Sequence, residues 1–253
     1  MTQAAAAGTV YLVGAGPGAP DLLTVRAVRL LGEAEIVFHD ALVPEAILRL
    51  APGARKIAVG KRSGRRSTAQ RFINKRLADA ARTHRVVVRL KGGDPMLFGR
   101  AHEEIAYLSG KNIPVQIVPG VTAALAASAE LRISLTERGI ARSVTFVTPR
   151  VGEGERASSW VAAAMAADTV AIYMGAGEAR AISAALMAAG KPGSTAVAVV
   201  EDSSLPGSRA RFGSLRNLPE LAPGTPAGPT LILLGEVYAE AARLFERQAS
   251  QAA

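Results

Sequence analysis

The chain contains no cysteine and few aromatic residues. Because none of its 253 residues is cysteine, disulfides, thiolate metal sites and cysteine nucleophiles are excluded, and a reducing, cytoplasmic compartment is favoured. Aromatic residues make up 4% of the chain, so few rings are present on which single-stranded nucleic acid could stack. No apolar run approaches the roughly 20 residues that span a bilayer, and "MTQAAAAG" lacks the regions of a signal peptide. We therefore expect no membrane partner.

Positive charge is what the chain has in excess. The formal net charge is +9, which calls for an anionic partner such as nucleic acid, a lipid surface or an acidic small molecule. The basic residues are scattered, except in "GKRSGRR" at residues 60–66. This run is either a solvated loop or a receptor for several carboxylates. A basic nucleic-acid-binding module stays open at this point as one hypothesis.

Strand-like and helix-like patterns alternate along the first half of the chain. The runs "TVYLVG", "EIVFHD", "RKIAVG", "RVVVRL" and "PVQIVPG" are typical of buried strands, and apolar residues recur at helical spacing between them. This order predicts a mostly parallel sheet with helices on its faces. A second α/β series begins at "PGVTAALAASAEL". We predict a disordered leader over residues 1–9, domains over 10–119 and 120–240, and a tail over 241–253.

The first strand runs into "VGAGPGAP", which has glycines at 14, 16 and 18. With Ala19 this nearly matches the G-x-G-x-x-G/A fingerprint of dinucleotide-binding folds, and Asp40 lies about where a ribose-binding acid is expected. Pro17 argues against this interpretation because it stiffens the turn and removes an amide that could donate to a pyrophosphate. A nicotinamide-dependent dehydrogenase nevertheless stays open as a rival hypothesis.

Two further glycine-bearing turns follow predicted strands, "KGGDP" at residues 91–95 and "PGVTAA" at residues 119–124. Ligands of open α/β sheets bind outside the carboxyl ends of the strands, so the three turns can converge on one crevice. Gly93 can adopt a positive φ and let a ligand approach the backbone, and Asp94 offers an acceptor to a hydroxyl or an ammonium group. Each motif alone is typical of a simple turn. Together they indicate a small-molecule site.

Taken in order, the motifs resemble those of a known family. "VYLVGAGPG", "GKRSG", "VVVRLKGGDPMLFGR", "VPGVTAA", "LTERGIARSVTFVT" and "VAIYMG" are similar to the tetrapyrrole methylases, and within them to the uroporphyrinogen-III C-methyltransferases. The resemblance covers nearly the whole chain. It implies a homodimer of two-domain α/β subunits, with a mixed sheet in the second domain and an active cleft between the domains.

The resemblance also implies a reaction. S-adenosylmethionine would donate methyl groups to rings A and B (C-2 and C-7) of uroporphyrinogen III, giving precorrin-2, the first committed step toward sirohaem and cobalamin. No metal is expected, because the sulfonium of the donor is already a good leaving group. The eight carboxylates of this substrate explain the basic charge better than nucleic acid does. Another corrin-pathway precorrin C-methyltransferase is the alternative within the family.

The family's site residues carry over to matching positions of this chain. An acid/base pair falls on Asp40 and Lys61. Guanidinium forks suit carboxylates, and the expected substrate anchors are Arg62, Arg65, Arg66, Arg138 and Arg142. The expected cofactor contacts are Pro17, Gly92, Gly93, Asp94, Leu97, Thr122, Ala123, Met174, Ser203 and Thr230.

Some of these positions have a second interpretation or depart from the family pattern. Asp40 could instead cap a helix in "ALVPEAI", and Met174 could be a core residue after an apolar strand. Ala41 stands where the family commonly has an arginine, so a substrate contact through a guanidinium is absent there. "VEDSSLPGSR" replaces the usual Glu-Asn-Gly-Thr pattern around Ser203.

Overall fold

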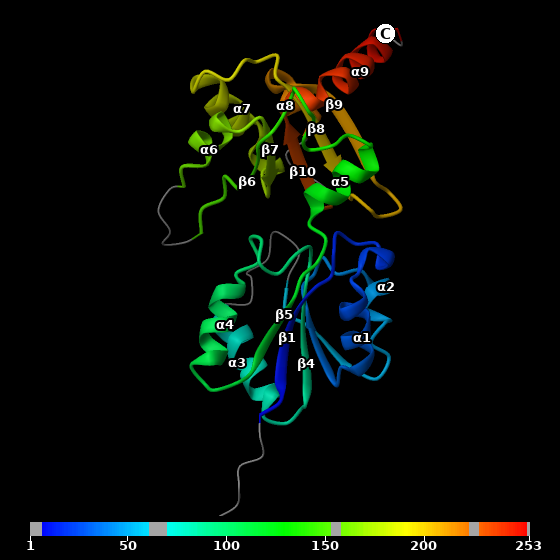
Figure 1. The fold of residues 1–253 in the computed structure, drawn as a ribbon, viewed down its shortest axis with the longest axis vertical. Helices are drawn as coiled ribbons and strands as arrows, with labels where there is room; N and C mark the ends of the chain where they lie inside the picture. The colour runs from blue at the N-terminus through cyan, green and yellow to red at the C-terminus, as the bar shows by residue number, and fades with distance from the viewer. Residues whose placement is uncertain (1–6, 61–69, 153–157, 223–227, 252–253) are drawn as a thin grey trace, which may run out of the picture. The chain divides into compact units, whose positions relative to one another are not determined.

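The computed structural model describes residues 7–60, 70–152, 158–222 and 228–251. The chain divides into two compact units, Met1–Thr122 and Ala123–Ala253, each of which contains one five-stranded sheet (Figure 1). The predicted α/β class, with a parallel first sheet and a mixed second sheet, is confirmed. In the described parts of the chain, no helix is long and apolar enough to cross a membrane.

The first unit is built on a sheet with the strand order β3-β2-β4-β1-β5. Every pairing between its strands is parallel, as expected for buried apolar runs that alternate with helices. The carboxyl ends of all five strands therefore lie at one edge of the sheet, which we call the first edge. The strands are β1 (Thr9–Gly14), β2 (Ile36–His39), β3 (Arg55–Ala58), β4 (Val86–Lys91) and β5 (Val115–Val118).

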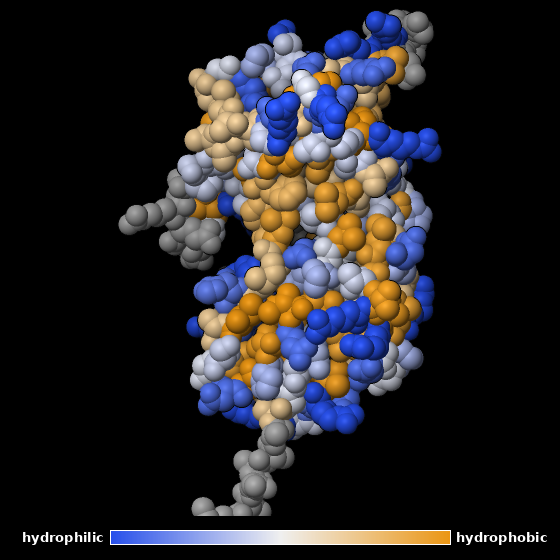
Figure 2. All heavy atoms as spheres, viewed as in Figure 1, coloured by the Kyte–Doolittle hydropathy of each residue, from blue (hydrophilic) through white to orange (hydrophobic). Residues whose placement is uncertain are grey.

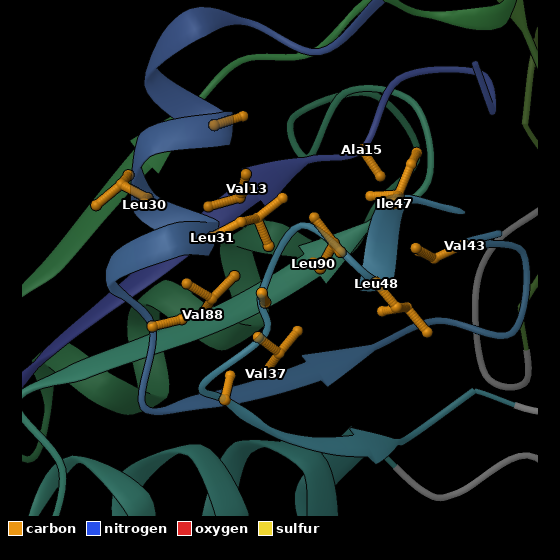
Figure 3. Close-up of a cluster of buried hydrophobic side chains, with 14 of the residues drawn as sticks. Val13, Ala15, Leu30, Leu31, Val37, Val43, Ile47, Leu48, Val88 and Leu90 are labelled. Carbon is orange, nitrogen blue, oxygen red and sulfur yellow. The ribbon is translucent and has the colours of Figure 1, made fainter. Parts of the chain in front are cut away.

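Helices cover both faces of this sheet. On one face pack α1 (Val25–Glu33) and α2 (Glu45–Leu48), whose apolar side chains meet those of the strands, as Figure 3 shows for Leu31, Ile47 and Val88. On the other face pack α3 (Gln70–Ala81) and α4 (Ala101–Ser109). The neighbouring strands β1 and β4 are thus followed by helices on opposite faces. Such a switch point is where open α/β sheets bind their ligands.

Helix α1 begins later than the apolar spacing suggests. The pattern extends back to Asp21, but residues Pro20–Leu22 form a separate 3-10 turn. The α-helix starts at Val25 because the hydroxyl of Thr24 accepts a hydrogen bond of 3.2 Å from the amide of Ala27. Thr24 thus satisfies one of the amides that the first helical turn leaves without a partner.

Removing this cap should weaken the first unit measurably. We expect Thr24→Ala to lower the free energy of unfolding by about 1 kcal/mol, the usual cost of a lost N-cap. Thr24→Ser keeps a hydroxyl at the same place and serves as the control, with little change. Chemical denaturation of the three proteins measures both values. Equal stability of Thr24→Ala and Thr24→Ser would contradict the assignment of the cap.

The second unit has a mixed sheet with the order β6-β7-β10-β8-β9. Strands β6 and β7 pair in parallel, and the other pairs are antiparallel. The strands are β6 (Val144–Val147), β7 (Thr169–Tyr173), β8 (Ala196–Glu201), β9 (Arg209–Ser214) and β10 (Thr230–Leu234). The helices are α5 (Ala123–Leu131), α6 (Trp160–Ala166), α7 (Ala179–Ala188), α8 (Leu218–Leu221) and α9 (Ala239–Gln251), with 3-10 turns at Ala176–Glu178, Leu215–Asn217 and Glu236–Tyr238.

The expected tail over residues 241–253 is instead mostly a helix. Residues 241–251 are helical and form most of α9. The start of this helix packs on the sheet, since Ala242 is buried in the core of the second unit and the ring of Phe245 lies 6.4 Å from that of Phe212 in β9. Ala242 and Phe245 are three residues apart, which is the spacing of neighbours on one helical face. Apolar residues at this spacing indicate a helix that packs against the sheet.

Candidate active site

Three glycines lie backbone to backbone at the first edge. Strand β1 pairs with both β4 and β5, so the turns after these strands are neighbours. A Cβ atom on Gly14 would lie 2.6 Å from Cα of Gly120 and 2.7 Å from the carbonyl oxygen of Gly93. Any side chain at Gly14 would therefore overlap the backbone of both neighbouring turns. The glycines bring the three turns together more closely than other residue types allow.

The loops after β1 and β4 are joined by two hydrogen bonds. The amide of Gly93 donates to the carbonyl of Gly16 (2.7 Å), and the amide of Gly16 donates to the carbonyl of Gly93 (3.2 Å). Both glycines have positive φ angles, +67° and +66°. A Cβ atom on Gly93 would meet no atom within 4 Å, so this side of the loop is open. We call this pair of hydrogen bonds between Gly16 and Gly93 the glycine bridge. The half-buried Pro17 and the exposed Gly92 are next to it in the chain, and both are predicted cofactor contacts.

The carboxylate of Asp94 is held by backbone amides of two loops. Met96 donates to one oxygen (2.7 Å) and Gly120 donates to the other (2.9 Å). The first bond closes a local turn, in which the amide of Leu97 also donates to the carbonyl of Asp94 (3.3 Å). The second bond ties the loop after β4 to the end of β5. Asp94 therefore fixes the loop geometry, and since a carboxylate has about four lone-pair sites, it can still accept a hydrogen bond from a ligand.

The predicted cofactor contacts of the second unit gather at one edge of its sheet. Strand β10 pairs antiparallel with β7 and β8, so its first residue, Thr230, lies beside the ends of those strands. Met174 directly follows β7, and Ser203 lies two residues after β8. The hydroxyl of Tyr173 accepts a hydrogen bond of 3.0 Å from the amide of Ala124. This bond places the start of α5, with Ala123, at the same edge.

Met174 is not a core residue. Its side chain is 45% exposed, and its φ of +57° is uncommon for a residue with a side chain. The alternative of core packing is therefore wrong.

The Ser203 segment is held in place by α5. Ser203 is buried, its hydroxyl donates to Glu130 (3.1 Å), and the amide of Ser204 donates to the same carboxylate oxygen (3.0 Å). The Ser203 oxygen can still accept a hydrogen bond from a ligand, whereas its hydroxyl proton already forms the hydrogen bond to Glu130. The hydroxyl of Thr230 likewise donates to the carbonyl of Gly228 (3.2 Å).

Asp40 lies at the end of β2 on the first edge and does not cap a helix. Helix α2 has Pro44 at its N-cap position, so that interpretation is wrong. The carboxylate is about one-third exposed and accepts a hydrogen bond from Nη2 of Arg89. Lys61, Arg62, Arg65 and Arg66 lie outside the described residues. Gly60, directly before them, lies against the backbone beside Asp40, because a Cβ atom there would be 2.7 Å from the amide nitrogen of Ala41.

A comparison of the sequence with family models decides the family. The model for "Tetrapyrrole (Corrin/Porphyrin) Methylases" matches residues 9–219. The chain belongs to this family. Its curated relatives include a sirohaem synthase of Nitrosococcus oceani, 43% identical over 92% of this chain, and one of Pseudomonas entomophila, 45% identical over 91%. The chain spans about half the length of these relatives, with 50% of each one covered.

Solved structures of tetrapyrrole methylases have the same fold. A uroporphyrin-III C-methyltransferase from Thermus thermophilus, complexed with S-adenosylhomocysteine, is 40% identical, with a TM-score of 0.80 over 94% of this chain and 100% of that one. A cobalt precorrin-4 methyltransferase is 25% identical, with a TM-score of 0.77 over 90% and 95%. Together with the family match, these structures support S-adenosylmethionine-dependent methylation of a tetrapyrrole as the chemistry of the chain.

Of the two predicted anchors in the second unit, Arg142 lies apart from the predicted cofactor contact Met174 of the same unit. Arg138 is exposed in the turn closed by Glu137 and Ala141. Arg142 is exposed just before β6, and its amide donates to Asp168, whose pKa this bond helps to lower. Because β6 runs parallel to β7, Arg142 lies at the edge of the sheet opposite Met174. Within this unit, Arg142 is therefore not close to the edge where Met174, Ser203 and Thr230 lie, which we call the Met174 edge.

Three charged residues behind Asp40 were not predicted from the sequence. Arg89 and Lys91 lie on β4 and are buried, as is Glu104 on α4. Glu104 accepts hydrogen bonds from Arg89 (3.1 Å) and from Lys91 (3.0 Å). Burial, together with the neighbouring Arg89, lowers the pKa of Lys91 in spite of its pairing with Glu104. The signal was present, since two charges at alternate positions of the apolar run "VVVRLK" point to one face of a buried strand.

The open side of Gly93 leads to a prediction about cofactor binding. We expect Gly93→Ala to weaken the binding of S-adenosylhomocysteine about tenfold or more, because the new methyl group would occupy the space over the loop and a left-handed residue costs about 1–2 kcal/mol. Titration calorimetry measures the affinity. Gly190→Ala is the matched control, since Gly190 also has a positive φ (+98°) and no atom within 4 Å of its Cβ position. Equal losses of affinity in both variants would show that backbone strain alone is responsible.

Proposed function

We propose that the chain transfers methyl groups from S-adenosylmethionine to C-2 and C-7 of uroporphyrinogen III, on rings A and B, and so makes precorrin-2. The single observation that carries the proposal is the open glycine bridge at the first edge, with the family's donor-site motif "KGGDP" on it. The bridge lies at the switch point between β1 and β4, where this class of sheet binds small molecules. The solved relative with 40% identity, a uroporphyrin-III C-methyltransferase, favours this substrate over that of the relative with 25% identity.

The residues of the chain have separate tasks in this proposal. Pro17, Gly93 and Asp94, with the other predicted contacts, bind the donor and align its methyl group with the nucleophilic ring carbon. The donor supplies an activated methyl group, so the protein needs no metal for this step. Asp40 accepts the proton that the methylated ring must lose. We assign Lys61 to the same acid/base pair.

The basic residues bind the substrate in this account. Strand β3 ends on the same edge as Asp40. Arg62, Arg65 and Arg66 come next in the sequence, and guanidinium groups suit the carboxylates of uroporphyrinogen III. Arg138 and Arg142 stay the predicted anchors of the second unit, although Arg142 lies at the edge of its sheet opposite Met174. On the face drawn in Figure 2, hydrophilic residues are spread over both units. The homodimer and the cytoplasmic location stay predictions from the sequence.

A binding experiment separates this function from its rivals. We expect calorimetry to detect S-adenosylhomocysteine binding, with no binding of NAD and no salt-dependent binding of a DNA duplex at physiological ionic strength. Labelled methyl from the donor should then appear in uroporphyrinogen III during incubation with the protein. Tight binding of NAD without binding of S-adenosylhomocysteine would instead support a dehydrogenase. Methyl transfer to a later corrin intermediate but not to uroporphyrinogen III would support another methylase of this pathway.

A further inference from the structure

A chain of four charged side chains runs from the first edge into the core of the first unit. It begins at Asp40, passes through Arg89 to Glu104, and ends at Lys91. The side chains of Arg89 and Lys91 are 4% exposed and that of Glu104 is fully buried, whereas Asp40 is 31% exposed. We call these four side chains the ionic chain. Asp40 is the only one of the four that is substantially exposed to solvent. Two positive and two negative groups balance within it.

Arg89 is held from three sides. Its Nε donates to Glu104 (3.1 Å), its Nη1 donates to the carbonyl of Leu90 (3.2 Å), and its Nη2 donates to Asp40. Glu104 is fixed in turn by Lys91 (3.0 Å) and by Gln70 (3.0 Å). The guanidinium plane therefore has one orientation, and that orientation presents a donor to the Asp40 carboxylate.

Stability alone does not explain the ionic chain. Moving charges out of water costs several kcal/mol per ion, and a buried ion pair is often no more stabilising than apolar residues of the same volume. The core between this face of the sheet and its helices is otherwise mainly apolar, with Val10, Ile73 and Leu77 in one cluster. A rigid set of ion pairs is expected where a functional carboxylate must be held in a defined position.

We propose that Arg89 and Glu104 are positioning residues for Asp40 in the methyl-transfer reaction. Arg89 holds the carboxylate at the end of β2 in the orientation needed to accept the proton from the methylated ring, and Glu104 fixes the plane of Arg89. Lys91 balances the charge of Glu104. This inference rests on the function proposed above, because it assigns Asp40 as the base.

The test uses substitutions that keep charge or shape. Arg89→Lys keeps the positive charge but loses the planar fork, and Glu104→Gln keeps the shape but loses the negative charge. We expect each to lower kcat on the order of 10- to 100-fold, because a small misplacement of a reacting group has effects of this size. KM and the affinity for S-adenosylhomocysteine should stay within about twofold. Arg82→Lys is the control, since Arg82 pairs with Asp79 on the surface, and it should keep full activity.

A double-mutant cycle shows whether Arg89 acts through Asp40. If it does, Arg89→Lys should cause no further loss of kcat in an Asp40→Asn background, since residues that act as a unit are strongly non-additive. Multiplying effects, or an unchanged kcat with only a lower melting temperature, would overturn the inference. If Arg89→Lys does not fold, the Glu104→Gln variant is put through the same cycle. Absence of methyl transfer by the wild-type protein would instead refute the proposed function, and the inference with it.

Discussion

Asp40→Asn should lower kcat for methyl transfer by about 10²- to 10⁴-fold, the usual contribution of a positioned general base. The substitution keeps the size of the side chain and an oxygen that can accept from Arg89, so the ionic chain stays largely in place. What it removes is the ability to take a proton from the methylated ring. Rapid-quench measurement of methyl incorporation gives kcat, and calorimetry gives the affinity for S-adenosylhomocysteine, which should not change.

A matched control separates this effect from a general loss of charge. Asp79 also carries a carboxylate bonded to an arginine, Arg82 (3.3 Å), but the pair is exposed on the surface. Asp79→Asn should therefore keep full activity. If Asp40→Asn were as active as Asp79→Asn, Asp40 would not be the base, and the role of the ionic chain would need another explanation.

Gly14→Ala should have the largest effect on the fold of the first edge. Its Cβ atom would lie 2.6 Å from Cα and the amide nitrogen of Gly120, and that amide is held by its hydrogen bond of 2.9 Å to the Asp94 carboxylate. We expect the free energy of unfolding to fall by about 3 kcal/mol, at the upper end of the range for overpacking. The loops after β1, β4 and β5 would shift apart, so binding of S-adenosylhomocysteine should be lost as well. Thermal denaturation and calorimetry measure the two effects.

Gly32→Ala is the control for Gly14→Ala. Gly32 lies in α1, has no positive φ, and a Cβ atom there would meet nothing within 4 Å. Alanine is the better helix former, so this substitution should raise the free energy of unfolding by about 0.5–1 kcal/mol. A Gly14→Ala protein as stable as wild type would show that the three strand ends are not packed against one another as described.

Much of the first unit could be predicted from local patterns. The apolar runs marked the strands of its sheet because a parallel strand is buried on both faces. The glycine-bearing turns indicated a shared ligand site because parallel strands end at one edge. The start of α1 at Val25 does not follow from the apolar spacing, which extends back beyond it, because the side-chain cap of Thr24 determines where the helix begins.

Pairings between residues far apart in the chain could not be predicted from local sequence patterns. Arg89 meets Asp40 because β2 and β4 are neighbours in the sheet although β3 lies between them in the chain. No local pattern gives that strand order. The same holds for Arg142, whose position opposite the Met174 edge follows from the parallel pairing of β6 with β7. The left-handed backbone of Met174 was likewise unexpected, because methionine has no preference for that conformation.

Counting the methyl groups transferred to each macrocycle tests the account most directly. The protein is incubated anaerobically with uroporphyrinogen III and S-adenosylmethionine that carries a labelled methyl group, and the tetrapyrrole products are resolved by mass spectrometry over time. We expect a product with one added methyl group that gives way to a product with two, at which the reaction stops. A tetrapyrrole with no added methyl group, from a protein that binds S-adenosylhomocysteine, would contradict it.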